Sequence, residues 1–175
     1  MPERKGLVNY KGKPVDLVGD DQIEVGQQVP DIVLSKSMEE DLHLSELRGK
    51  VIVLNVVPSI DTPVCSVQTA RFEREAAEFS DGVRIVAVSM DLPFAIERWC
   101  KQNDIKIVIP TSDYKYHDLG TKFSLQMKGL GLLARSVFVI NREGKLTYQE
   151  VVKNMEEEPD YEAALLAVRT VVGSK

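Results

Sequence analysis

The chain of 175 residues has only two cysteines, Cys65 and Cys100, and they do not form a Cys-x-x-Cys pair. A framework of several disulfides is therefore excluded, and a dithiol oxidoreductase is disfavoured. Only two histidines are present, His43 and His117, and neither shows the cysteine–histidine spacing of a zinc site. We therefore predict no metal and no cofactor, and we expect both histidines to be ordinary surface or hydrogen-bonded core residues.

Long runs of one charge and long apolar runs are also missing. Lys and Arg total 22 against 27 Asp and Glu, for a net charge of −5, and no extended basic run indicates a nucleic acid or an anionic membrane as partner. No segment approaches the roughly 18 apolar residues that span a bilayer. Met1–Lys5 lacks the apolar core of a signal peptide. We therefore expect a soluble, cytoplasmic protein.

The pattern of apolar residues predicts a single α/β domain over residues 1–175. Runs of β-branched residues alternate with segments whose apolar residues recur at helical spacing, which predicts parallel strands joined by helical crossovers. We expect strands at Val51–Val57, Val83–Val88 and Ile105–Ile109, and helices from Pro63 to about Phe79 and from Leu92 to about Asn103.

Both ends of the chain depart from this alternation. Leu7–Tyr10 and Val15–Val18 flank a turn signal and predict an N-terminal β-hairpin. Ser136–Ile140 and Lys145–Val152 predict a second hairpin, and a terminal helix is expected to open at Pro159. A strand–helix half followed by a hairpin and a helix is the layout of a thioredoxin-like fold, with a central mixed sheet flanked by helices.

Cys65 lies in the segment that gives the clearest indication of a reactive site. The string PSIDTPVC, from Pro58 to Cys65, follows the apolar run Val51–Val57 and predicts a tight loop and a new helix after a buried strand. Thr62 is a favourable N-cap, and Pro63 suits the first helical position. Cys65 would then lie in the first helical turn, where free N–H groups and the helix dipole favour a thiolate, and we expect it to be open to a small oxidant.

Four segments together resemble peroxiredoxins, and they are closest to the bacterial thiol peroxidases of the Tpx type. The segments are PSIDTPVC (58–65), SMDLPFA (89–95) followed by Trp99 and Cys100, GLLAR (131–135) and EPDYEAA (158–164). They keep the family's order along nearly the whole chain. The resemblance implies an antioxidant enzyme, an atypical two-cysteine peroxidase that reduces hydrogen peroxide and organic hydroperoxides.

The resemblance also implies roles for individual residues. Cys65 falls on the peroxidatic position and Cys100 on the resolving position, so a sulfenic acid on Cys65 would be replaced by an intramolecular Cys65–Cys100 disulfide. Thr62, Arg135 and Pro58 fall on the remaining active-site positions. Thioredoxin is the family's usual reductant, and the family expectation is a homodimer.

The residues taken alone leave other interpretations open. Thr62 could only cap the helix, Pro58 could only end the strand, and Arg135 could be a surface or structural residue. Cys65 and Cys100 could each pack as small apolar residues, or they could form a permanent disulfide. Oxidation of the thiol could also serve a sensor that binds a partner, with peroxide turnover incidental.

A bond between the two cysteines would require a structural change. A normal disulfide needs Cα atoms within about 6 Å, whereas Cys65 begins one predicted helix and Cys100 lies in the middle of another. We expect one or both of these segments to loosen locally before the bond forms. Because Trp99 adjoins Cys100, its fluorescence should change on oxidation.

Overall fold

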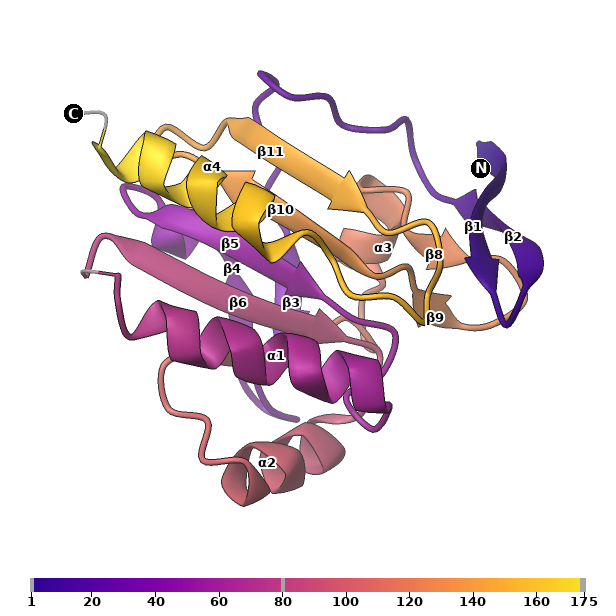
Figure 1. Ribbon diagram of the computed structural model, residues 1–175, viewed down its shortest axis with the longest axis horizontal. Coiled ribbons are helices and arrows are strands. Elements are labelled where there is room, and N and C mark those ends of the chain that lie inside the picture. The colour runs from indigo at the N-terminus through magenta and orange to yellow at the C-terminus, as the bar shows by residue number, and fades with distance from the viewer. Residues whose placement is uncertain (1, 80, 174–175) are drawn as a thin grey trace.

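The computed structural model describes residues 2–79 and 81–173, and within these residues the largest element is a seven-stranded mixed sheet (Figure 1). The strand order is β11 (Leu146–Val151), β10 (Ser136–Ile140), β5 (Val51–Val56), β6 (Val83–Ser89), β7 (Ile109–Ser112), β3 (Val33–Ser35) and β4 (Asp41–His43). The central pairs β5–β6 and β6–β7 are parallel, and the other pairs are antiparallel. The expected mixed sheet and C-terminal hairpin are confirmed.

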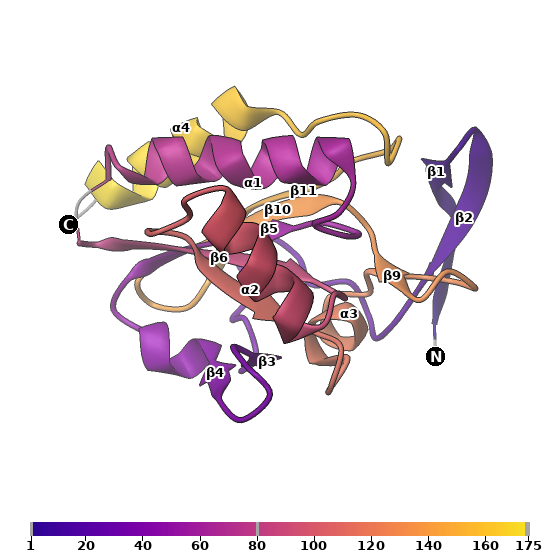
Figure 2. The ribbon, with the colours of Figure 1, turned by 90° about the horizontal axis from the view of Figure 1, so that it is seen from below.

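Helices cover both faces of this sheet, as the two perpendicular views show (Figures 1 and 2). Two of them, α1 and α4, lie side by side on one face, whereas α3 and η1 lie on the other and α2 packs along β7. Their bounds are α1 Pro63–Ala76, α2 Pro93–Gln102, α3 Asp118–Lys122, α4 Tyr161–Gly173 and the 3₁₀ helix η1 Leu44–Leu47. In the part of the chain described, every helix is too short or too polar to cross a membrane.

The N-terminal hairpin is confirmed and belongs to a second, smaller sheet. Strands β1 (Glu3–Tyr10) and β2 (Lys13–Val18) pair antiparallel, and β8 (Gln126–Met127) and β9 (Leu132–Leu133) continue the sheet. The two turn residues, Lys11 and Gly12, both have positive φ (49° and 75°). Positive φ at both central positions matches the right-handed twist of the paired strands.

Strand β5 passes through the middle of the core and is buried at all six residues. Ile52, Leu54 and Val56 pack in the hydrophobic cluster on one side of the sheet, whereas Val51 and Val53 pack against α1 and α4 on the other. Because side chains alternate along a strand, Asn55 faces the same side as Val51 and Val53, toward α1.

The strand expected at Ile105–Ile109 is wrong, because β7 begins only at Ile109 and runs to Ser112. The backbone N–H groups of residues 106–108 donate to the side-chain carboxylate of Glu73 instead of to a neighbouring strand. Helix ends also differ slightly, since α1 stops at Ala76 and α4 begins at Tyr161, two residues after Pro159.

Gly19 follows the hairpin at a point of close backbone contact, which yields a test of the fold. A Cβ atom there would lie 2.5 Å from Ser124 Cα and 2.6 Å from the Thr121 carbonyl oxygen. Gly19→Ala should therefore lower the free energy of unfolding in urea by roughly 1–3 kcal/mol. Gly173→Ala is the control, because a Cβ at that exposed end of α4 meets nothing within 4 Å. Equal stability of the two variants would contradict this packing.

Candidate active site

Cys65 lies in the first turn of α1, as the sequence predicts, and Pro63 is the first helical residue. The expectation that its sulfur is open to a small oxidant is wrong for this conformation, because Cys65 has no exposed surface. The neighbouring residues Asp61, Thr62 and Pro63 are exposed. The thiol therefore lies below the surface, next in sequence to a short exposed segment, and not in an open cleft.

Arg135 is a buried charged residue whose guanidinium reaches the sulfur of Cys65. The residue is only 2% exposed, and its Nη2 lies 3.3 Å from Cys65 Sγ. Nε and Nη2 both donate to the carbonyl oxygen of Met155, at 3.0 and 2.7 Å, and Nη1 donates to Gln68 Oε1 at 3.0 Å. A buried guanidinium is tolerated only when its donors are paired, and these contacts fix its orientation.

A chain of buried side chains, which sequence reasoning missed, extends from this guanidinium. Gln68 Nε2 donates to Asn55 Oδ1, Asn55 Nδ2 donates to Thr69 Oγ1 (3.2 Å), and the Thr69 hydroxyl donates to the carbonyl of Cys65 (3.0 Å). Two signals were present in the sequence. Asn55 interrupts an apolar run, and a buried amide needs partners. Gln68 and Thr69 follow Cys65 by three and four residues, which places them on its helix face.

The N-terminal hairpin holds the segment that carries Met155. Asn9 of β1 donates its backbone N–H to the carbonyl of Lys153 (2.7 Å) and accepts the N–H of Met155 (2.9 Å). Its side-chain amide also donates to Asn154 Oδ1 (3.0 Å). The carbonyl that accepts two bonds from Arg135 is thus supported by a strand more than a hundred residues away in sequence.

Thr62 occupies the N-cap position, but the expected capping bond from its side chain is absent. Its hydroxyl instead donates to the carbonyl of Ser59 at 3.2 Å, and its backbone N–H bonds the same oxygen at 3.3 Å. Both bonds close the loop ahead of the helix. In this conformation the hydroxyl is directed to Ser59 rather than to the sulfur of Cys65.

Pro58 is buried in the loop that leaves β5, and a carboxylate from another strand end holds this loop. Asp91 accepts the Ser59 hydroxyl at 2.8 Å and the Ile60 N–H at 2.7 Å. The segment 89–95 was noted in the sequence only as a family string, and the role of Asp91 in it was missed. Asp91 fixes the chain on the N-terminal side of Cys65.

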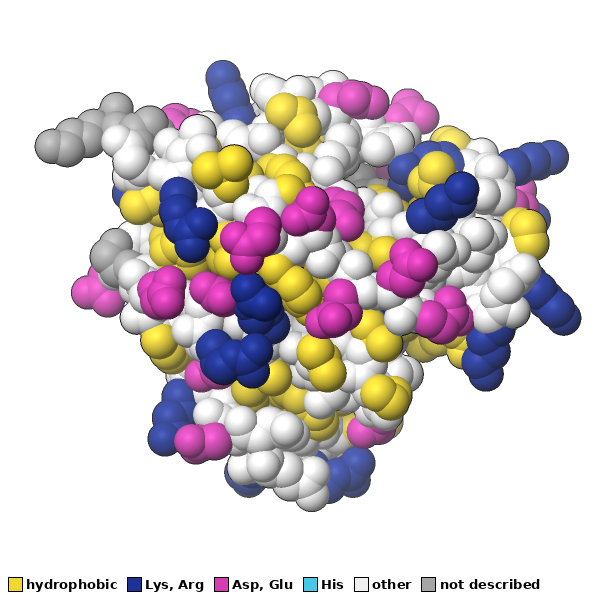
Figure 3. Space-filling model, viewed as in Figure 1, with side chains coloured by type: hydrophobic (Ala, Val, Ile, Leu, Met, Phe, Trp, Pro, Cys, Tyr) yellow, Lys and Arg dark blue, Asp and Glu magenta, His cyan; other side chains and the backbone are white. Residues whose placement is uncertain are grey.

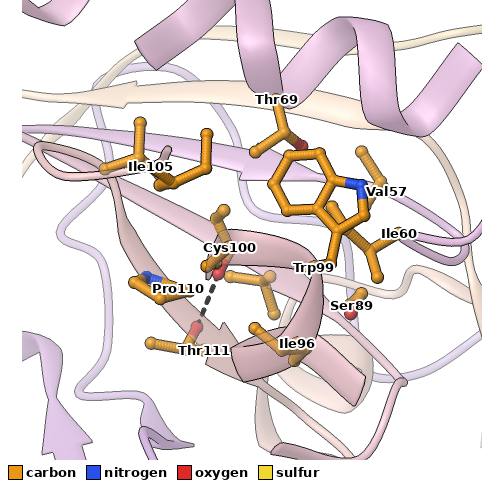
Figure 4. A pocket seen from close by; sticks show the side chains of 13 residues that line it. Val57, Ile60, Thr69, Ser89, Ile96, Trp99, Cys100, Ile105, Pro110 and Thr111 are labelled. Carbon is orange, nitrogen blue, oxygen red and sulfur yellow. Dashed lines mark hydrogen bonds between the residues drawn. The ribbon is translucent and has the colours of Figure 1, made fainter. Parts of the chain in front are cut away.

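Cys100 lies on α2 as a half-buried thiol, and both cysteines are free. Burial, with a smaller contribution from the charge of Glu73, raises the pKa of Cys100 to about 11. The thiol borders a small apolar cavity that Trp99 and Thr69 also line but Cys65 does not (Figure 4). Trp99 Nε1 donates to Ser66 Oγ at 3.1 Å, which ties α2 to the first turn of α1.

The molecular surface over α1 and α4 carries interspersed acidic and basic side chains (Figure 3). Arg71 of α1 pairs with Glu75 at 2.8 Å and with Glu162 of α4 at 3.4 Å.

Elsewhere, His43 Nδ1 lies 3.0 Å from a carboxylate oxygen of Asp31, which raises the pKa of the histidine. Over residues 2–79 and 81–173, no group of three or more His, Cys, Asp or Glu side chains is arranged to hold a metal ion.

The raised pKa of Cys100 can be tested in Cys65→Ser, where Cys100 is the remaining thiol. With a pKa of about 11, only about one molecule in ten thousand carries the thiolate at pH 7. Alkylation by iodoacetamide, followed by mass spectrometry, should accelerate about tenfold per pH unit until the pH approaches that pKa. Circular dichroism checks that the fold persists. A rate that levels off near pH 8.5 would contradict the burial of this thiol.

Comparisons with known proteins agree with this architecture. Residues 24–165 match the Redoxin family. Thiol peroxidases from Bacillus subtilis and Oceanobacillus iheyensis are 45% and 44% identical, covering 94% and 90% of this chain and 98% and 95% of theirs. A crystal structure of a peroxiredoxin-like protein from Aquifex aeolicus, 37% identical, superposes with a TM-score of 0.87 over 94% of this chain and 96% of that one. A thiol peroxidase from Chromobacterium violaceum, 14% identical, shares the fold with a TM-score of 0.83, covering 96% and 98%. The chain therefore belongs to the Redoxin family and, within it, to the thiol peroxidases, enzymes of the peroxiredoxin type that reduce peroxides by means of a thiol.

Proposed function

We propose that this peroxidase reduces hydrogen peroxide and organic hydroperoxides with Cys65 as the peroxidatic nucleophile and Arg135 as its electrostatic partner. The observation that carries this assignment is the 3.3 Å contact between Arg135 Nη2 and Cys65 Sγ in a fully buried site. A guanidinium is always charged at neutral pH. Away from water, its attraction for a thiolate is stronger than it would be at the surface.

In the first step the Cys65 thiolate attacks the distal oxygen of the peroxide. A sulfur–oxygen bond forms, the oxygen–oxygen bond breaks, and water or an alcohol leaves after taking up a proton, so that Cys65 becomes a sulfenic acid. Arg135 supports this step by donating to the reacting atoms as negative charge moves from sulfur to the leaving oxygen. Because Met155 and Gln68 already hold the guanidinium, little reorganisation is needed during the reaction.

Pro58 and Thr62 have supporting roles in this proposal. Pro58, which offers no N–H donor and is buried at the end of β5, limits the access of water to the sulfur. Thr62 releases Ser59 and turns its hydroxyl toward the incoming peroxide and the thiolate. Because Cys65 is covered in the described conformation, the exposed segment 61–63 must move to admit the substrate.

The second step joins the two cysteines. The Cys100 thiol attacks the sulfenic sulfur of Cys65, the disulfide forms, and water leaves. Cys100 borders a cavity that Cys65 does not line, so α2, the first turn of α1, or both must loosen. A thioredoxin then reduces the disulfide, and NADPH recycles the thioredoxin through its reductase. We further propose that the enzyme works in the cytoplasm as a homodimer, as the family resemblance implies.

A coupled assay with thioredoxin, thioredoxin reductase and NADPH tests this function. Wild type should turn over hydrogen peroxide continuously, whereas Cys65→Ser should show no turnover because the nucleophile is missing. Cys100→Ser should form a sulfenic acid, trapped by dimedone and seen by mass spectrometry, at the normal initial rate but should recycle poorly. Full turnover by Cys65→Ser would disprove the assignment. A single stoichiometric oxidation of wild type would favour a sensor over an enzyme that removes peroxide.

A further inference from the structure

Glu73 connects the helix that carries Cys65 to the segment that follows the helix of Cys100. It lies on α1, and its carboxylate accepts hydrogen bonds from three successive backbone N–H groups. The nitrogen–oxygen distances are 2.7 Å for Lys106, 2.9 and 3.1 Å for Ile107, and 2.7 Å for Val108. Hydrogen bonds to a charged acceptor are stronger than neutral ones, and successive N–H groups that point the same way suit an anion. One side chain therefore holds this whole turn.

The turn is coupled to Cys100 through the backbone. Ile105, the residue directly before it, donates its N–H to the carbonyl of Cys100 at 3.0 Å. Asn103 closes the end of α2 with two bonds to the carbonyl of Trp99, from its backbone N–H (3.0 Å) and from its side-chain amide (2.9 Å). Displacement of the last turn of α2 therefore pulls directly on the residues that Glu73 holds.

Apolar packing holds this turn at Val108 but not at Lys106 and Ile107. Lys106 is exposed, and Ile107 is 49% exposed, so of the three residues bonded to Glu73 only Val108 is buried. Cys100 itself lies between the small apolar cavity of Figure 4 and an outer surface groove. Val108 and Ile105 pack against the core cluster beneath α1, so the Glu73 bonds are the main attachment of the two exposed residues between them.

We propose that Glu73 is a positioning residue that latches the Cys100 segment against α1 and thereby sets the rate of disulfide formation. This inference rests on the proposed function of Cys65 and Cys100. With the latch closed, Cys100 stays beside the cavity that Cys65 does not line, and the two sulfur atoms do not meet. Once it opens, the Cys100 thiol attacks the sulfenic sulfur: the sulfur–sulfur bond forms, the sulfur–oxygen bond breaks, and the hydroxyl leaves as water with the thiol proton.

The latch also affects how much of the Cys65 sulfenic acid is oxidised further. A second peroxide can oxidise Cys65 from sulfenic to sulfinic acid, which releases water or an alcohol and prevents disulfide formation. This second oxidation competes with the release of Cys100. A tighter latch therefore gives more sulfinic acid for a given peroxide concentration, and a looser latch gives less.

Rapid mixing of the full-length protein with hydrogen peroxide tests the latch. Trp99 is the chain's one tryptophan, and its fluorescence, with acid quench and mass spectrometry, follows both steps. Glu73→Ala should accelerate the peroxide-independent phase, disulfide formation, about tenfold through loss of the bonds. The peroxide-dependent phase should not change. The peroxide concentration that gives half sulfinic acid should rise by a similar factor.

Glu73→Gln distinguishes the latch from a simple effect of charge. The amide keeps one oxygen that can accept hydrogen bonds from the turn. Glu73→Gln should therefore accelerate disulfide formation less than Glu73→Ala does, about threefold. If only the loss of negative charge mattered, the two variants would form the disulfide at equal rates, and that result would disprove the latch. Hydrogen exchange at the amides of residues 106–108 should be faster in Glu73→Ala, in step with the resolving rate.

Glu78→Gln is the matched control, because it removes one negative charge from an exposed residue just beyond the end of α1. It should leave both phases as in wild type. Disulfide formation at the wild-type rate in Glu73→Ala would overturn the latch while leaving the proposed function intact. Failure of the wild type itself to form a Cys65–Cys100 disulfide would instead overturn the proposed function and the latch with it.

Discussion

The contact between the buried guanidinium of Arg135 and the sulfur of Cys65 is the interaction on which the rest of the site depends. A charged side chain that is only 2% exposed must have its donors satisfied, or it would destabilise the fold by several kcal/mol. The carbonyl of Met155, the side chain of Gln68 and the sulfur together accept those donors. Asn55 on β5 extends the same network, so the middle of the sheet, α1 and the segment after β11 converge on one thiol.

This arrangement gives the N-terminal hairpin a place in the structure of the site. The hairpin lies beside the central sheet rather than within it (Figure 1). Even so, the backbone of Asn9 hydrogen-bonds Lys153 and Met155, and its side-chain amide bonds Asn154. The two halves of the chemistry are then held differently. Cys65 is fixed by a dense, buried polar network, whereas the Cys100 segment is attached by a partly exposed turn bonded to Glu73. Rigidity at the first thiol and release at the second suit the proposed reaction, in which the second step must bring the two sulfur atoms together.

Much of the fold could be predicted because its elements have strong local signals. The apolar run of β5, broken only by Asn55, predicts a strand covered on both faces, and the Thr–Pro pair predicts the start of α1 at Pro63. The signals failed where a distant side chain competes with local structure. Ile105–Ile109 has the composition of a strand, but Glu73 accepts the N–H groups that a strand would need. At Thr62 the difference is local: the residue is the N-cap as predicted, but its hydroxyl donates to the carbonyl of Ser59 and makes no capping bond. The local pattern ahead of α1 indicated Cys65, and the family resemblance led to Arg135. The sequence held signals for Asn55 and Gln68, but their hydrogen-bond partners and the burial of the thiol depend on tertiary contacts that no local pattern contains.

The most direct measurement of the central interaction is the second-order rate constant of Cys65 with hydrogen peroxide when Arg135 is replaced. In a Cys100→Ser background, dimedone trapping and mass spectrometry isolate this step. Arg135→Gln should lower the constant by about a hundredfold, as the loss of one buried charge-stabilising donor does in other enzymes. Arg135→Lys should recover only part of it, because an ammonium cannot reproduce the planar fork that serves Met155, Gln68 and the sulfur together. Circular dichroism confirms that each variant is folded, and a rate constant within twofold of the parent value in folded Arg135→Gln would contradict the account.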